Sequence, residues 1–138
     1  MFWSLIADRW LIDTLLALPE VQAVFDDRIY RDQAPEGTPA PVLIVTRVAD
    51  EPSQPLGQPV TSWTFDYDVA GWDDGLSVAR IAPAMDAIDA ALTEADAAPV
   101  DGHHVTCWEL SELPAAPPPR AGEPPTVRLG KTYRIYVS

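Results

Sequence analysis

Residues 61–72 read Thr-Ser-Trp-Thr-Phe-Asp-Tyr-Asp-Val-Ala-Gly-Trp, and the alternation within this stretch decides the fold. Polar Asp66 and Asp68 stand between apolar neighbours. Because successive side chains of a strand point to opposite faces, the alternation predicts a strand with one apolar and one polar face. The apolar side chains occupy every second position: Trp63, Phe65, Tyr67 and Val69.

A helical pattern follows this strand. Asp73-Asp74-Gly75 ends the strand, and the pattern predicts a turn and a helix N-cap there rather than a calcium loop, since regularly spaced acidic ligands are missing. The next apolar residues lie three or four positions apart, which predicts a helix that packs back on the apolar face of the strand. Pro83 falls within the pattern and predicts a kink near Ile81 or a helix in two pieces. The apolar residues are Val78, Ile81, Met85, Ile88 and Leu92.

The remaining elements complete a sheet and its cover. Ser4 can cap a first helix that runs to about Leu18, and residues 20–25 can form a short helical turn. Residues 97–102 are expected to form a connector. Long strands joined by long hairpins predict an α+β fold, with a mostly antiparallel sheet of four to five strands and two helices packed on one face. The other expected strands are 28–31, 42–48, 103–113 and 126–138.

Proline-rich loops are the second marked feature. The chain has 138 residues, the size of one domain, and we expect a single domain over 1–138. Its 15 prolines cluster outside the periodic stretches, in loops at about 50–60 and 114–125. Because proline reduces the entropy lost when a loop docks, these loops suit contacts with other chains. The candidate partner-contact residues are Pro52, Pro55, Leu56, Pro117, Pro118 and Arg120.

The charge and the cysteine count exclude several classes. The formal net charge is −12, and the nine basic residues are scattered, which disfavours direct affinity for DNA. The acidic surface either repels DNA that must slide past it or only keeps the protein soluble. Cys107, the single cysteine, excludes an intrachain disulfide and is expected in the core. Residues 1–9 lack the features of a secretory signal, and no stretch approaches the length of a membrane span, so we expect the protein to be made and used in a cytoplasm.

We find no combination of residues that indicates an enzyme. His103 and His104 are adjacent on a predicted strand and face opposite ways, so simple strand geometry does not let both ligate one metal. Asp66 and Asp68 share a face and form either a carboxylate pair, a solvated face, or a surface that meets a neighbour or a lumen. Trp3 and Trp10 are either core residues or anchors for a neighbouring chain. We therefore expect no catalytic residues, no cofactor and no metal.

Short phrases in a fixed order run along most of the chain. They are Leu15-Leu16-Ala17-Leu18-Pro19-Glu20-Val21, Arg28-Ile29-Tyr30, Ala34-Pro35-Glu36-Gly37, Pro41-Val42-Leu43-Ile44-Val45 and Tyr133-Arg134-Ile135-Tyr136-Val137. The 63–69 strand and the long Ala-rich helix precede the last of these phrases. This order of elements and phrases resembles the tail-terminator or tail-completion proteins of long-tailed bacteriophages.

The resemblance implies a structural role in the virion, at the head–tail junction. Such proteins form a ring, usually of six copies, on the head-proximal end of the tail tube. The ring stops tube growth and joins the filled head, and DNA passes through its lumen without specific binding. The implied partners are further copies of the chain, the tail tube protein and a head-completion or neck protein, with no membrane. The family has no catalytic residues to transfer.

Two other hypotheses remain open. The chain is either the tail terminator or another neck component, such as a head-completion or stopper protein, which shares the ring but binds the portal side. The other hypothesis belongs to a different functional class: the chain is a small enzyme or a ligand-binding domain. Such a protein would need a pocket with converging polar groups.

Overall fold

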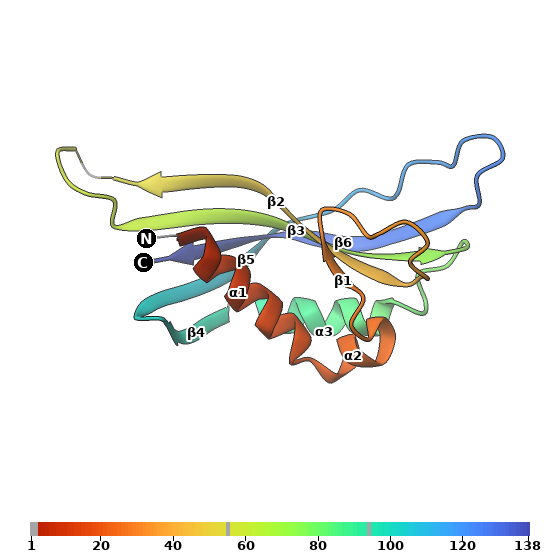
Figure 1. The fold of residues 1–138 in the computed structure, drawn as a ribbon, viewed down its shortest axis with the longest axis horizontal. Helices are drawn as coiled ribbons and strands as arrows, with labels where there is room; N and C mark the ends of the chain where they lie inside the picture. Colours follow the sequence, from red (N-terminus) through yellow and green to blue (C-terminus); the bar gives the residue numbers. More distant parts are fainter. Residues whose placement is uncertain (1–2, 55, 94) are drawn as a thin grey trace.

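The computed structural model describes residues 3–54, 56–93 and 95–138, and within them a curved sheet carries its helices on one face (Figure 1). The described residues form three helices and six strands. The helices are α1 (Trp3–Leu16), α2 (Pro19–Phe25) and α3 (Ala82–Leu92). The strands are β1 (Ile29–Arg31), β2 (Val42–Ser53), β3 (Ser62–Asp74), β4 (Ala95–Val100), β5 (His103–Glu112) and β6 (Thr126–Val137).

The strand order is β1-β2-β3-β6-β5-β4, so β6 lies in the middle of the sheet although it comes last in sequence. β1 pairs with β2 in parallel, and every other pair is antiparallel. The predicted α+β class and the mostly antiparallel sheet are therefore correct. The expected four to five strands and two helices undercount the described elements, because β4 and α2 were not predicted as full elements.

The strand predicted over 63–69 is the centre of the fold. β3 pairs along its length with both β2 and β6. Phe65, Tyr67 and Val69 are buried beneath the helices, together with Met85 and Ile88 of α3. α3 covers the apolar face of the sheet, as predicted, but it lies chiefly over β6 and β5, whereas α1 contacts β3 and β6.

The prediction of a kink at Pro83 is wrong. α3 begins at Ala82, so Pro83 lies in its first turn, where a missing backbone N–H costs no intrahelical bond. Val78 lies before the helix, yet it still packs against the core. Ile81 occupies the N-cap position without a side-chain hydrogen bond, so Asp73 and Asp74 do not cap the helix as predicted.

Two further boundaries differ from the predictions. The expected connector over 97–102 is largely strand β4, whose alanine-rich sequence has no strand periodicity and is paired with β5 by tertiary context. β2 continues to Ser53, beyond the predicted end at residue 48, although Asp50 and Pro52 are residue types typical of a loop. This extension lies beyond the end of β1 and forms an exposed sheet edge, where proline is tolerated.

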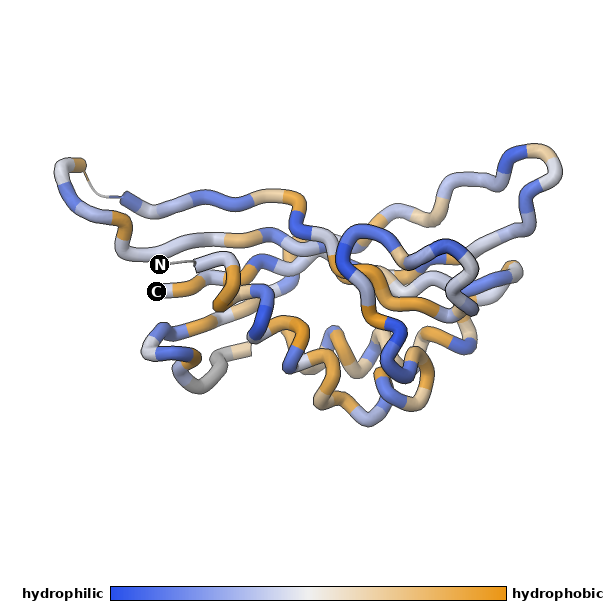
Figure 2. The backbone as a smooth tube through the Cα atoms, in the orientation of Figure 1, coloured by the Kyte–Doolittle hydropathy of each residue, from blue (hydrophilic) through white to orange (hydrophobic). Residues whose placement is uncertain are grey.

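The core residues lie between the sheet and the helices. Trp10 is buried in α1, and Cys107 is buried in β5, as predicted for the cysteine. Trp3 is only partly buried, and its ring packs edge-on against His103 with the ring centroids 4.6 Å apart. Figure 2 shows hydrophobic residues gathered in the helices and the adjoining strands, whereas the two long loops are mostly hydrophilic or intermediate.

The two long loops flank the opposite, uncovered face of the sheet. The β2–β3 hairpin and the loop between β5 and β6 project at opposite ends of the molecule, and both rise on the side away from the helices (Figure 1). No described helix combines the length and apolarity needed to cross a bilayer.

Candidate assembly surface

The uncovered face of the sheet, called the open face below, carries an ordered row of polar pairs. The register of β3 and β6 places Asp66 opposite Arg134 and Asp68 opposite Thr132. Arg134 donates two hydrogen bonds to Asp66, from Nε to Oδ1 at 2.8 Å and from Nη2 to Oδ2 at 3.0 Å. Thr132 Oγ1 donates to Asp68 Oδ1 at 2.7 Å. The two aspartates thus share a face, as predicted, but each is bonded to β6 rather than to the other.

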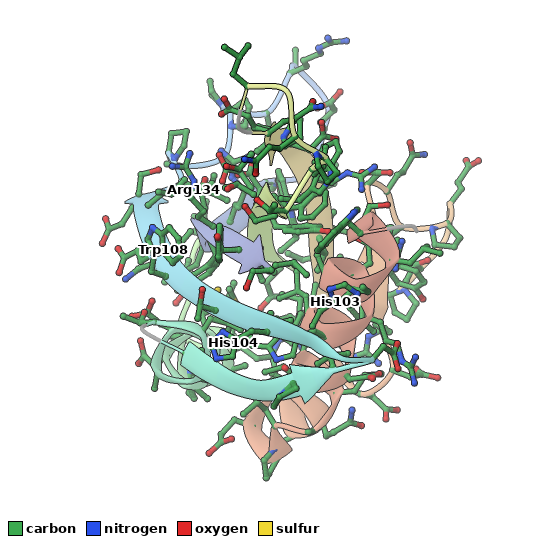
Figure 3. The ribbon with its side chains drawn as sticks, turned by 90° about the vertical axis from the view of Figure 1, so that its left-hand side faces the viewer. His103, His104, Trp108 and Arg134 are labelled. Carbon is green, nitrogen blue, oxygen red and sulfur yellow. The ribbon has the colours of Figure 1, made fainter. Side chains whose placement is uncertain are left out.

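An exposed tryptophan lies beside this ion pair. Trp108 of β5 stands opposite Arg134 of β6, and Figure 3 shows the two on the same side of the sheet. Trp108 is 38% exposed, which is high for a large apolar side chain. The next pair on this face is Thr106 with Tyr136. Trp108 is exposed, and Arg134 and Tyr136 are partly buried. Tryptophan, tyrosine and arginine are the residue types enriched where proteins bind one another.

A groove lies at the other end of the open face, beneath residues 32–40. Its volume is about 480 Å³. The floor comes from β2 and β3, one wall from residues 32–40, and the other wall from Leu113 and Arg128. The guanidinium carbon of Arg128 lies 5.2 Å from the ring centroid of Trp72, a cation–π contact across neighbouring strands. The floor residues are Val42, Ile44, Thr46, Asp68, Ala70 and Trp72.

On the helix-covered face, one polar cluster ties α1 to the sheet. Tyr67 Oη donates a hydrogen bond to Asp8 Oδ1, and Arg31 Nη1 lies 2.7 Å from Asp8 Oδ2. Burial and the bond to Asp8 raise the pKa of the Tyr67 hydroxyl far above its usual value. The cluster joins α1, β1 and β3, so its role is structural.

A second cluster ties α3 to β5 and β6. Asp89 accepts hydrogen bonds from Lys131 Nζ at 3.0 Å and from Tyr133 Oη at 2.9 Å. Burial would raise the pKa of Asp89, but the bonds from Lys131, Tyr133 and Thr93 outweigh it and hold the pKa below its usual value. Glu109 Oε2 lies 3.2 Å from Lys131 Nζ. This cluster is also fully engaged within the chain.

Asp73 is buried at the end of β3 and is bound by Arg80 of the segment that follows the strand. Arg80 Nε donates to Asp73 Oδ2 at 3.0 Å, and Arg80 Nη2 donates to Asp73 Oδ1. The bond from Arg80 lowers the pKa of the Asp73 carboxyl. The pair fixes the turn between β3 and α3, and so takes the place of the predicted cap.

The predicted loop residues divide into three groups. Pro52 lies in β2 opposite Trp63, not in a loop, and Pro55 lies outside the described residues. Leu56 is fully exposed next to the tip of the β2–β3 hairpin. Pro117, Pro118 and Arg120 are exposed in the loop between β5 and β6.

The histidines do not form a site together. His103 packs against Trp3 on the helix side, whereas His104 is exposed, and Figure 3 shows them apart on β5. Within the described ranges, no group of three or more His, Cys, Asp or Glu side chains is arranged to hold a metal ion.

Sequence reasoning missed the partners of the open-face aspartates. Arg134, Trp108 and Arg128 were not predicted as surface contacts. The alternation of β6 does place Arg134 on the open face. Arg134 lies between the buried Tyr133 and Ile135, so its side chain faces away from the core. Which aspartate it meets depends on strand register, and the sequence does not specify that register.

Three comparisons with known proteins bear on this surface. Residues 9–113 match the model of the family described as tail completion protein gp17. A chain in the solved structure of the virion of a native gene transfer agent (GTA) particle has a similar fold, with a TM-score of 0.62 and 20% sequence identity. The match covers 92% of this chain and 90% of that chain. No curated protein sequence gives a significant match.

The family match spans most of the chain, from α1 through the end of β5, and includes the β3 strand that organises the sheet. The chain therefore belongs to the tail completion protein gp17 family and is a structural component of a phage-type virion.

Proposed function

We propose that this protein forms a ring, of six copies, on the head-proximal end of the tail tube. The ring ends polymerisation of the tube protein there and joins the tail to the head. The observation that carries this proposal is the tail completion family match over residues 9–113. The arrangement of the open face between two projecting loops supports it, because a capping ring needs separate surfaces for its own copies, for the tube and for the head.

The ring requires two different complementary patches on each copy, since like-to-like contacts close as pairs. The open face supplies one such patch. Asp66 and Asp68 face either a neighbouring subunit or the lumen, and the bonds on this face favour the subunit contact. Arg134 neutralises Asp66, so the pair adds no net negative charge to a lumen, and the exposed Trp108 beside it suits burial against protein.

DNA passes through the ring without specific binding in this proposal. The net charge of −12 supports this, because an acidic protein surface repels the phosphate backbone. Most of the basic side chains are also occupied within the chain. Arg31, Arg80 and Arg134, for example, all pair with carboxylates.

Electron microscopy of the purified protein mixed with tail tube protein tests the proposal. The expected result is a ring at one end of each tube and a tube population that stops lengthening. Tubes that lengthen equally with and without the protein, and carry no density at their ends, would contradict it.

The second hypothesis, a head-completion or stopper protein, is separated by pull-down. The full-length chain is immobilised and offered the tube protein and portal-side proteins in parallel. Retention of the tube protein supports the terminator role, whereas retention of portal-side proteins alone would assign the chain to another part of the neck.

A further inference from the structure

The loop between β5 and β6 is much longer than its two strands require. The strands are antiparallel neighbours, which a turn of two to about five residues is able to join. Residues 113–125 instead make a long excursion that contains six prolines, and nearly all of them are exposed. Loops of this length without regular structure are usually either functional or disordered.

Both ends of the loop are fixed to the body of the molecule. Arg128 Nη2 donates a hydrogen bond to the carbonyl of Pro114 at 2.7 Å. At the other end, the Gly75 N–H donates to the carbonyl of Pro125 at 3.0 Å. Proline-rich backbone favours the extended polyproline conformation, which is stiff without internal hydrogen bonds. The loop therefore presents its tip at a defined position and loses little entropy on binding.

Arg120 lies at this tip with its charge unused. Its backbone N–H donates to Glu123 Oε2 at 3.3 Å, which closes a turn. Its guanidinium makes no ion pair with any carboxylate of the described residues, in contrast to the paired Arg31, Arg80 and Arg134. A stiff run, Pro117–Pro119, therefore leads directly to a free positive charge.

The groove on the open face has the complementary chemistry. Apolar floor residues, including Ile44 and Trp72, resemble in character the aromatic-lined surfaces on which proline-rich segments dock. Asp32 and Asp74 stand at its rim, and neither forms an ion pair within 4.0 Å among the described residues. The one arginine of the groove, Arg128, is engaged with the loop stem and with Trp72.

The occupant cannot be the same copy of the loop. Leu113, Thr126 and Arg128, which flank the loop, form one wall of the groove. From that wall the loop rises away from the sheet (Figure 1), so its tip points out of its own groove.

We propose that residues 114–120 of one copy bind in the open-face groove of a second copy, with Arg120 next to Asp74 and Asp32. This inference rests on the self-association in the proposed function and names the contact that would build the ring. The loop and the groove are different patches, so the contact is heterologous, as a closed ring requires.

Cross-linking of the full-length chain tests which patches meet. Two single-site variants, Pro118→Cys in the loop and Thr38→Cys in the groove wall, are mixed and treated with a short bis-maleimide. Cys107 is buried, so it does not compete. The expected product is a mixed dimer of the two variants. Gln54→Cys, exposed near the other hairpin, serves as the matched control and should give no product with Thr38→Cys.

Charge reversal tests the role of Arg120. Arg120→Glu or Asp74→Arg alone should each raise the dissociation constant for self-association about tenfold. The two reversals in one chain should restore it to within about threefold. Asp27→Arg, an exposed acid outside the groove, is the control and should leave the constant unchanged. Circular dichroism confirms that each variant is folded.

The outcomes separate this contact from the proposed function. A wild-type protein that assembles and caps tubes, but shows neither the cross-link nor the charge effect, would overturn the contact and leave the ring intact. A protein that stays monomeric and does not cap tubes would overturn the ring itself. Loss of capping by Asp74→Arg with no effect of Arg120→Glu would assign the groove to a different chain.

Discussion

The two faces of the sheet are built from the same strands, yet they use their polar side chains differently. On the helix-covered face, Tyr67 and Asp89 lie in closed clusters whose bonds join helices to strands. On the open face, the Asp66–Arg134 pair joins strand to strand and leaves the guanidinium side chain 39% exposed. Both arrangements are partly exposed, but the first joins the helices to the sheet, while the second lies on a face that no described helix covers.

This difference between the two faces assigns them different roles, one in the stability of the fold and the other in assembly. Apolar burial on the helix-covered face supplies the main driving force for folding. Partly exposed ion pairs contribute little to folding, but they hold charged groups in fixed positions, which is what recognition by another chain requires. Substitutions on the two faces should therefore affect different measurements.

The largest expected effect comes from a cavity on the helix-covered face. Ile88→Ala removes a side chain that is fully buried between α3 and the sheet, and should lower the free energy of unfolding by about 2–5 kcal/mol. Urea unfolding followed by tryptophan fluorescence measures this. Leu76→Ala, at a side chain that is 87% exposed, is the control and should change stability by less than about 0.5 kcal/mol. Equal losses in the two variants would contradict the assignment of the core.

The second effect is a loss of stability in alkali. Burial raises the pKa of the Cys107 thiol from 9.0 to about 12. Between these values the thiol ionises only in the unfolded chain, so the stability it contributes is complete below pH 9 and is lost as pH rises towards 12. The loss should be about 1.4 kcal/mol for each pH unit.

Cys107→Ala isolates this contribution. The variant should be less stable at neutral pH because it leaves a cavity, but its stability should fall less steeply between pH 9 and pH 11 than that of the wild type. Since the tyrosines titrate in both proteins, the difference in slope reports the thiol and its effect on the pKa of Tyr133. Parallel slopes would show that the thiol is accessible to water.

The third effect contrasts two glycines. A Cβ at Gly130 would lie 2.1 Å from the carbonyl oxygen of Val69, so β3 and β6 would have to move apart. A Cβ at Gly71 would meet chiefly side chains, with the sulfur of Met85 at 2.9 Å and a ring carbon of Phe25 at 3.0 Å. Gly130→Ala should therefore cost about 1–3 kcal/mol of stability, and more than Gly71→Ala. Thermal unfolding of the two variants ranks them, and the reverse order would show that the core is more rigid than the sheet.

The smallest effect on folding is expected for the open-face ion pair. A double-mutant cycle of Asp66→Ala and Arg134→Ala should give a coupling energy of at most about 1 kcal/mol, because the pair is partly exposed. The same variants should reduce tube capping clearly if this face meets a neighbouring subunit. A large loss of stability with normal tube capping would show that the ion pair contributes to folding rather than to assembly.

The fold was largely predictable because its central strand alternates over many residues. The same alternation allowed β6 to be predicted from Val127 to Val137. β4 was not predictable, since an alanine-rich segment with Pro99 carries no strand signal and is held by its pairing with β5. The predicted kink at Pro83 is wrong for a different reason. A proline in the first turn of a helix and a proline in its interior look alike in the sequence, and only the start of α3 at Ala82 distinguishes the two cases.

The candidate surface was predictable in outline but not in its contacts. The shared face of Asp66 and Asp68 follows from strand geometry alone. Their partners, Arg134 and Thr132, are more than sixty residues away in sequence, and pairing them requires the register of β3 with β6. The groove joins residues 32–40 to β3 and to the β5–β6 loop, a meeting of segments that the sequence pattern does not reveal.

The central place of β6 also governs how the molecule is made. Until Thr126–Val137 has left the ribosome, β3 and β5 each have an open edge with unpaired backbone groups, and the sheet is in two separate halves. Each half has a strand edge to which other nascent chains can add. β6 closes both edges at once, so the two halves of the sheet become one structure only when this strand is added.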